Sequence, residues 1–148
     1  MHRFLTIILL AVLVVGCGQK AEEPAASESV VEEANPLAAY AGEWSLQALA
    51  QDTDDVLVEL GMTASDSPEG WAMNFGHLSE PVPGNQVMAQ GDSVMVTFGP
   101  YWSALQDEVM VTTSSVLRLE GDQLVGHFTA TYTGGDPPVL NGRLVGNM

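Results

Sequence analysis

The residues of this chain best suited to chemistry are its one cysteine, its histidines and its 19 acidic side chains. Cys17 is the only thiol, and the chemical reactivity of a lone cysteine usually decides its role. His77 and His127 lie far apart in the sequence, and neither has further donors at the spacing of a zinc site. Asp52-Thr53-Asp54-Asp55 starts like a calcium loop, but the glycine and later oxygen ligands are absent, which favours a solvated turn. We therefore expect no metal and no cofactor.

Nucleophilic catalysis has little support in the sequence. The chain contains neither Gly-x-Ser-x-Gly nor Ser-x-x-Lys, two arrangements that activate a serine. Its only lysine, Lys20, lies in a polar stretch near the N-terminus. Paired carboxylates can act as acid and base, but with 19 acidic residues some pairs are expected by chance. We predict that the protein is not an enzyme.

The N-terminus has the organisation of a secretory signal. His2 and Arg3 precede Phe4 to Val15, an unbroken apolar run. A membrane-spanning helix needs about 20 apolar residues, so this run is too short to span. It falls in the range of about 7–15 residues that is typical of the apolar part of a signal peptide.

The end of this run resembles the lipobox of bacterial lipoprotein signal peptides. In Leu13-Val14-Val15-Gly16-Cys17, an aliphatic residue stands three positions before the cysteine and a small one directly before it. The resemblance implies a diacylglycerol on the Cys17 thiol, cleavage after Gly16 and acylation of the new N-terminus. Gly18, in place of aspartate, implies sorting to the outer membrane of a Gram-negative cell. The alternative, an ordinary signal peptide, would leave an exposed thiol in an oxidising compartment.

Composition divides the rest of the chain in two. Residues 17–36 contain five glutamates, two prolines and no aromatic residue, which predicts a disordered tether that follows the 1–16 signal peptide. An amphipathic helix over 27–34 is the alternative for part of this tether. Residues 37–148 are long enough for one domain. With Cys17 lipidated no disulfide can form, so this domain must depend on its core.

The net charge of −15 limits the possible partners. An acidic chain repels phosphate backbones, so we expect no nucleic-acid binding, and the membrane contact must come from the lipid on Cys17. A cationic protein, peptide or metal ion would complement the charge. Solubility or adaptation to salt explains the same charge without any partner.

Residues 37–148 show the period-two alternation of β-strands. Short runs rich in β-branched and aromatic residues alternate with turn signals, which indicates an all-β sandwich or barrel. Gly121-Asp122 between two alternating runs predicts a hairpin. Successive hairpins favour an antiparallel up-and-down arrangement. The predicted strands lie within residues 44–50, 56–63, 70–75, 93–98, 108–119, 123–133 and 141–145.

The two ends of this domain resemble the calycins, the group of lipocalins, fatty-acid-binding proteins and avidins. Gly42-Glu43-Trp44 supplies a Gly-x-Trp on the first strand, and Arg143 lies on the last. The resemblance implies a small closed barrel in which the Arg143 guanidinium stacks on the Trp44 indole. A β-sandwich is the alternative fold, in which Trp44 is an ordinary core residue and Arg143 an ordinary surface charge.

These features predict a lipid-anchored lipoprotein of the bacterial cell envelope that faces the periplasm or the cell surface. Its β domain would bind a small apolar ligand or play an accessory part in the envelope. Trp71, Tyr101 and Trp102 lie near turns and are the candidate ligand-binding residues, because exposed aromatics at a barrel mouth would suggest an entrance. The alternative is an acidic interaction module that binds or inhibits a cationic protein such as lysozyme.

Overall fold

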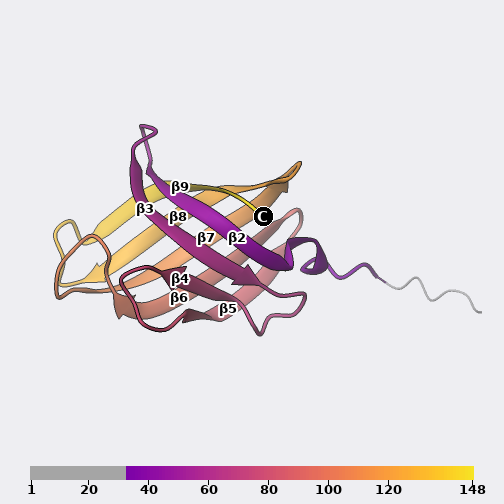
Figure 1. Ribbon diagram of the computed structural model, residues 1–148, viewed down its shortest axis with the longest axis horizontal. Helices are drawn as coiled ribbons and strands as arrows, with labels where there is room; N and C mark the ends of the chain where they lie inside the picture. The colour runs from indigo at the N-terminus through magenta and orange to yellow at the C-terminus, as the bar shows by residue number, and fades with distance from the viewer. Residues whose placement is uncertain (1–32) are drawn as a thin grey trace, which may run out of the picture. The chain divides into compact units, whose positions relative to one another are not determined.

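The computed structural model describes residues 33–148, and residues Asn35–Met148 form one compact unit. Eight antiparallel strands close into an up-and-down barrel, in which each strand pairs with the next and the last pairs with the first (Figure 1). A short 3-10 helix, η3 (Ala38–Tyr40), precedes them. The strands are β2 (Gly42–Ala50), β3 (Val56–Ala64), β4 (Ala72–Phe75), β5 (Val82–Gln90), β6 (Ser93–Trp102), β7 (Met110–Glu120), β8 (Gln123–Thr133) and β9 (Val139–Asn147). The fold is therefore the predicted all-β barrel and not a sandwich.

The alternation read from the sequence sets which side chains face inward. Along β8, Leu124, Phe128, Ala130 and Tyr132 are buried, while the residues between them are exposed or half-buried. His127 is exposed on the outer face, as its place in the alternation predicts. An eight-stranded barrel has an interior that side chains fill or that holds one small ligand.

Two-residue hairpins join β5 to β6 and β7 to β8 at one end of the barrel. Glu120 pairs with Gln123 and Gln90 with Ser93, so Gly121-Asp122 and Gly91-Asp92 are the loops. Both glycines have positive φ, near 60°, at the first central position, where a hairpin of the II′ kind requires it. This confirms the predicted Gly121-Asp122 hairpin.

Strand β5 was not predicted from the sequence. Pro83 and Gly84 lie near its start, and both residue types are depleted in strands because proline lacks the N–H and glycine has no side chain to pack. In the barrel, β5 pairs with the short β4 only at Ala72–Pro83 and Met73–Val82, and with β6 from Gly84 onward. The sparse pairing with β4 accommodates the proline.

Aromatic residues seal the barrel end that carries η3. The Trp44 indole N–H donates to the Tyr40 carbonyl over 2.8 Å, and the Tyr40 hydroxyl donates to the Asp92 carbonyl over 2.9 Å. The rings of Tyr40 and Trp71 lie 6.2 Å apart between centroids. Leu37, Tyr40, Trp44 and Trp71 are each at most 5% exposed. This end of the barrel is therefore filled, and we call it the sealed end.

In the part of the chain that the structure describes, no helix has the length and apolar character needed to cross a membrane.

Truncating the sealed end should destabilise the fold strongly. Trp44 is 4% exposed, so Trp44→Ala removes a buried indole and is expected to lower the free energy of unfolding by about 3–5 kcal/mol, measured by urea denaturation. Trp102, at 56% exposed, provides the matched control. Trp102→Ala should change the same quantity by less than about 0.5 kcal/mol. Equal losses in the two variants would contradict this assignment of the core.

Candidate functional site

A cavity opens at the opposite end of the barrel, which we call the open end. It lies between the inner faces of the strands and the β6–β7 loop, residues 103–109. The volume available to the centres of water-sized molecules is about 50 Å³. One water needs about 10–15 Å³ on that scale, so the cavity admits several waters or the end of a slender organic molecule. The lining residues from the strands are chiefly apolar, among them Leu57, Leu60, Met73, Phe75, Phe128 and Leu144.

Besides Ser103 of the β6–β7 loop, four hydroxyl-bearing residues on the strands interrupt this apolar lining. Tyr101 and Thr113 share a hydrogen bond of 2.8 Å between their hydroxyl oxygens. Tyr132 also lines the cavity. Ser115 lies two residues deeper than Thr113 along β7, is fully buried and lines the cavity, and its Oγ has no hydrogen-bond partner among the described residues. A buried hydroxyl without a partner costs about 1–3 kcal/mol, so Ser115 is a ready partner for a polar group of a bound molecule.

The ionisation of the two cavity tyrosines is suppressed. Burial raises the pKa of Tyr101 above its ordinary value, and the hydrogen bond with Thr113 lowers it by less. Burial also raises the pKa of Tyr132, against a smaller opposing effect of a hydrogen bond with Ser103. Both side chains are therefore neutral at physiological pH, and the cavity lining carries no charged side chain.

The β6–β7 loop forms one wall of the cavity mouth. Ser103, Ala104 and Leu105 line the cavity, and Leu105 remains 43% exposed. The Ser103 hydroxyl accepts hydrogen bonds of 3.0 Å from the backbone N–H groups of Leu105 and Gln106. The Gln106 side chain accepts from Asp136 N–H over 3.0 Å and donates to the Pro137 carbonyl over 3.3 Å. Gln106 thus fastens this loop to the β8–β9 loop across the open end.

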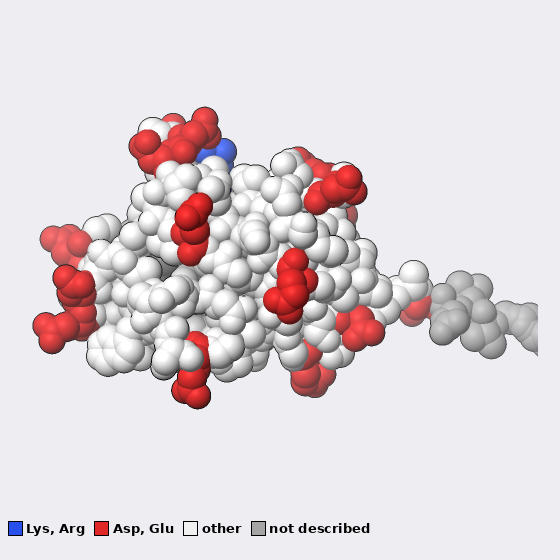
Figure 2. Space-filling model, in the orientation of Figure 1, with Lys and Arg blue, Asp and Glu red and all other residues white. Residues whose placement is uncertain are grey.

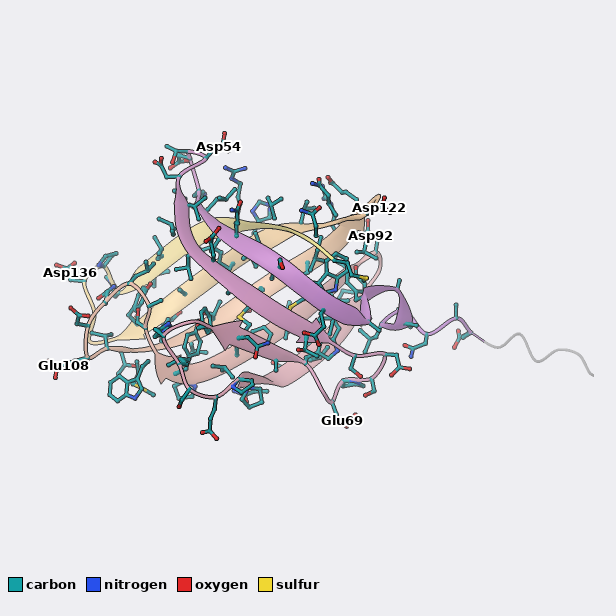
Figure 3. The ribbon with its side chains drawn as sticks, viewed as in Figure 1. Asp54, Glu69, Asp92, Glu108, Asp122 and Asp136 are labelled. Carbon is teal, nitrogen blue, oxygen red and sulfur yellow. The ribbon has the colours of Figure 1, made fainter. Side chains whose placement is uncertain are left out.

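Acidic side chains surround the mouth. Every loop at the open end carries at least one, and Figure 3 shows Asp54, Glu108 and Asp136 on loops at this end, away from Glu69, Asp92 and Asp122 at the other. Arg143 is the one basic residue that the described chain places here, and its guanidinium is paired with Asp54. Figure 2 shows carboxylates at both ends of one face and between them, whereas basic side chains, in blue, lie only beside the β2–β3 hairpin. The acidic residues of the open-end loops are Asp52, Asp54, Asp55, Glu80, Asp107, Glu108 and Asp136.

The three predicted ligand-binding aromatics lie in three different places. Tyr101 lines the cavity. Trp71 is buried at the sealed end, where its indole N–H donates to the Ser67 carbonyl over 2.9 Å. Trp102 follows Tyr101 on β6, but its side chain is 56% exposed. Of the three, only Tyr101 could contact a molecule in the cavity.

The structure does not bring Trp44 and Arg143 together. Trp44 faces the barrel interior, whereas Arg143 is on the outer face of β9, where it pairs in register with Leu49 rather than with Trp44. The Arg143 guanidinium donates to the Thr53 carbonyl over 2.6 Å and to the Asp54 carboxylate over 2.8 Å. The predicted stacking fails because the two side chains lie on opposite faces of the barrel wall. The pairing of β2 with β9 closes the barrel without it.

Neither His77 nor His127 lines this cavity. His77 contacts the Phe75 ring, with centroids 5.5 Å apart, and its Nε2 lies 2.9 Å from the Trp102 carbonyl oxygen. Within residues 33–148, no three His, Cys, Asp or Glu side chains are grouped so that they could hold a metal ion. Cys17 and the predicted signal peptide and most of the predicted tether lie outside the described residues.

Thr113 and Ser115 were not singled out from the sequence. The sequence contained a pattern that could have identified them. Alternate positions on β7 are occupied by Val111, Thr113, Ser115 and Leu117, and all four are buried. Polar residues on the buried face of a strand are informative, because a burial cost must be met there. The register with β6 and β8 then decides that Ser115 lies opposite Val96 and Phe128.

Comparisons with known proteins found no matching family model, no matching curated protein and no matching solved structure.

The partly buried Tyr101 hydroxyl should make the fold sensitive to alkaline pH. The unfolded chain releases this proton near pH 10, and the folded protein holds it to higher pH. The free energy of unfolding should therefore stay level up to about pH 10 and fall above it, as ionisation stabilises the unfolded chain. Urea denaturation at a series of pH values measures this fall. Tyr101→Phe should make the fall shallower, and an unchanged slope would contradict the role given to burial.

Proposed function

We propose that this protein is a lipid-anchored lipoprotein of the bacterial envelope whose β-barrel domain binds a small apolar ligand. The observation that carries the ligand part is the cavity at the open end, with its apolar lining. Ligand sites in proteins are concave and mostly apolar, with a few polar groups that fix orientation, and they occur in the mouths of β-barrels. The barrel supplies these features at its open end.

The filled sealed end supports the same proposal. A barrel packed with side chains along its whole length would leave no room for a ligand, and here the large aromatics Trp44 and Trp71 are concentrated away from the cavity. The lining of the other half includes two small side chains, Ala48 and Ala130, which leave space between the larger ones. The proposed role is binding, with no catalytic step assigned.

The anchor is the second part of the proposal. It rests on the apolar run, Gly16 and Cys17 in the sequence. One acyl chain gives only reversible membrane binding, so two or more chains on Cys17 would hold the protein firmly without spanning the bilayer. The expected location is the outer membrane, with the barrel exposed to the periplasm or the cell surface.

An acidic interaction module is the second candidate, and the distribution of charge favours it. The described chain has only two basic residues, Arg118 and Arg143, each paired with a carboxylate. Carboxylates over the loops would steer a cationic protein toward the barrel ends. Capture of lysozyme by the purified protein, with release at high salt, would favour this candidate over ligand binding.

Filling the cavity tests ligand binding. With the full chain in lipid nanodiscs, n-hexane should slow amide hydrogen exchange in peptides from β7 and β8, since ligand binding stabilises the folded state. Ala130→Leu puts a larger side chain into the lining and should abolish the slowing. Ala89→Leu, at an exposed position on β5, should leave it unchanged. No slowing in the unmodified protein, or equal slowing in both variants, would contradict cavity binding.

Mass spectrometry of the mature chain tests the anchor. Protein purified from the membranes of a Gram-negative host should begin at Cys17 and carry the mass of a diacylglycerol with a further acyl chain. Cys17→Ser should keep residues 1–16 and lose the added mass. A bare thiol at Cys17 in the unmodified protein would contradict the anchor.

A further inference from the structure

We propose that the cavity selects uncharged ligands that carry a hydroxyl or carbonyl group, held by Ser115, and that it rejects carboxylates. This inference rests on the proposed ligand-binding function and names the chemical class of ligand. Three independent features carry it: the unpartnered Ser115 hydroxyl, the uncharged lining and the ring of acidic loops at the mouth.

Ser115 is the cavity-lining residue with an unused hydrogen-bonding group. It is fully buried, and its Oγ has no partner among the described residues. The neighbouring hydroxyls of Tyr101 and Thr113 are already bonded to each other. A serine hydroxyl can donate one hydrogen bond and accept others, so an alcohol, ketone, ester or amide satisfies it.

The lining offers nothing to balance an ionised head group. Its polar side chains all carry hydroxyl groups, and burial keeps Tyr101 and Tyr132 neutral. A carboxylate taken into such a site loses its hydration without gaining a counter-charge, which is costly in an apolar interior. Arg143, the basic side chain at this end, is on the outer face and engaged with Asp54.

The mouth adds a second barrier against anions. The four loops around it carry seven carboxylates, so the local potential is negative (Figure 3). Such a field lowers the local concentration of anions and raises that of cations. Salt screens this contribution over about 10 Å at 0.1 M, whereas the uncharged lining acts at any ionic strength.

A matched series of six-carbon probes tests the selectivity. The full chain in lipid nanodiscs is titrated with n-hexane, 1-hexanol, hexanoate and hexylamine at neutral pH, and hydrogen exchange of β7 and β8 peptides gives the apparent affinities. We expect 1-hexanol to bind most tightly and hexanoate at least about tenfold more weakly, at low and at high salt, since a charge without a partner is costly to bury.

Ser115→Ala distinguishes the contribution of the hydroxyl group to binding from that of the apolar cavity. The variant should bind 1-hexanol about three- to tenfold more weakly, the usual effect of one hydrogen bond, and n-hexane as before. Ser115→Thr keeps the hydroxyl and should keep the preference for 1-hexanol over n-hexane. Ser114→Ala, at the neighbouring outward position on β7, is the control and should bind all probes as the unmodified protein does.

The outcomes distinguish the two proposals. Equal binding of n-hexane, 1-hexanol and hexanoate, with no effect of Ser115→Ala, would overturn the selectivity and leave ligand binding in place. Tightest binding of hexanoate or of hexylamine would overturn it too, since either requires a charged head group to be accepted. Binding of none of the four probes would overturn both proposals.

Discussion

The pairing of β2 with β9 is the constraint on which the rest of this structure depends. Six residue pairs, from Ser45–Asn147 to Ala50–Gly142, join the first strand to the last and close the sheet. Closure pairs the two strands that would otherwise be sheet edges and creates the enclosed interior in which a cavity can exist. Gly146 and Gly142 permit the close approach, because a Cβ at Gly146 would collide with Leu46 and one at Gly142 with the Phe128 ring.

Closure alone would give a barrel with two equivalent ends, and the packing of the side chains at each end makes them different. Tyr40, Trp44 and Trp71 fill one end and are tied to backbone carbonyls by their polar atoms. At the other end the lining combines small, aliphatic and aromatic side chains with hydroxyls but leaves a cavity, and a loop fastened by Gln106 borders the mouth. Because of this asymmetry, the barrel has one end closed by side chains and one end through which a small molecule can enter the cavity.

The charge of this protein is arranged around that interior and not within it. Carboxylates occupy loops at both ends, where water solvates them, and the cavity lining is uncharged. The two arginines form exposed or half-exposed ion pairs on the outer surface, each of which contributes about 0–1 kcal/mol. Stability therefore comes from the buried core, while the surface charge influences which molecules approach the mouth.

Sequence alone determined the local features, because alternation and turn chemistry act between near neighbours. The inward face of β8, the Gly121-Asp122 hairpin and the outward position of His127 all follow from period-two patterns. Only the tertiary structure decided which distant residues meet. Trp44 and Arg143 lie on opposite faces because the β2–β9 register sets Arg143 beside Leu49. Strand β5 was missed because it contains Pro83, and its position depends on its pairing with β4 and β6. The burial of Ser115 is also decided by the tertiary structure, since β7 has a buried face only when the other seven strands enclose it.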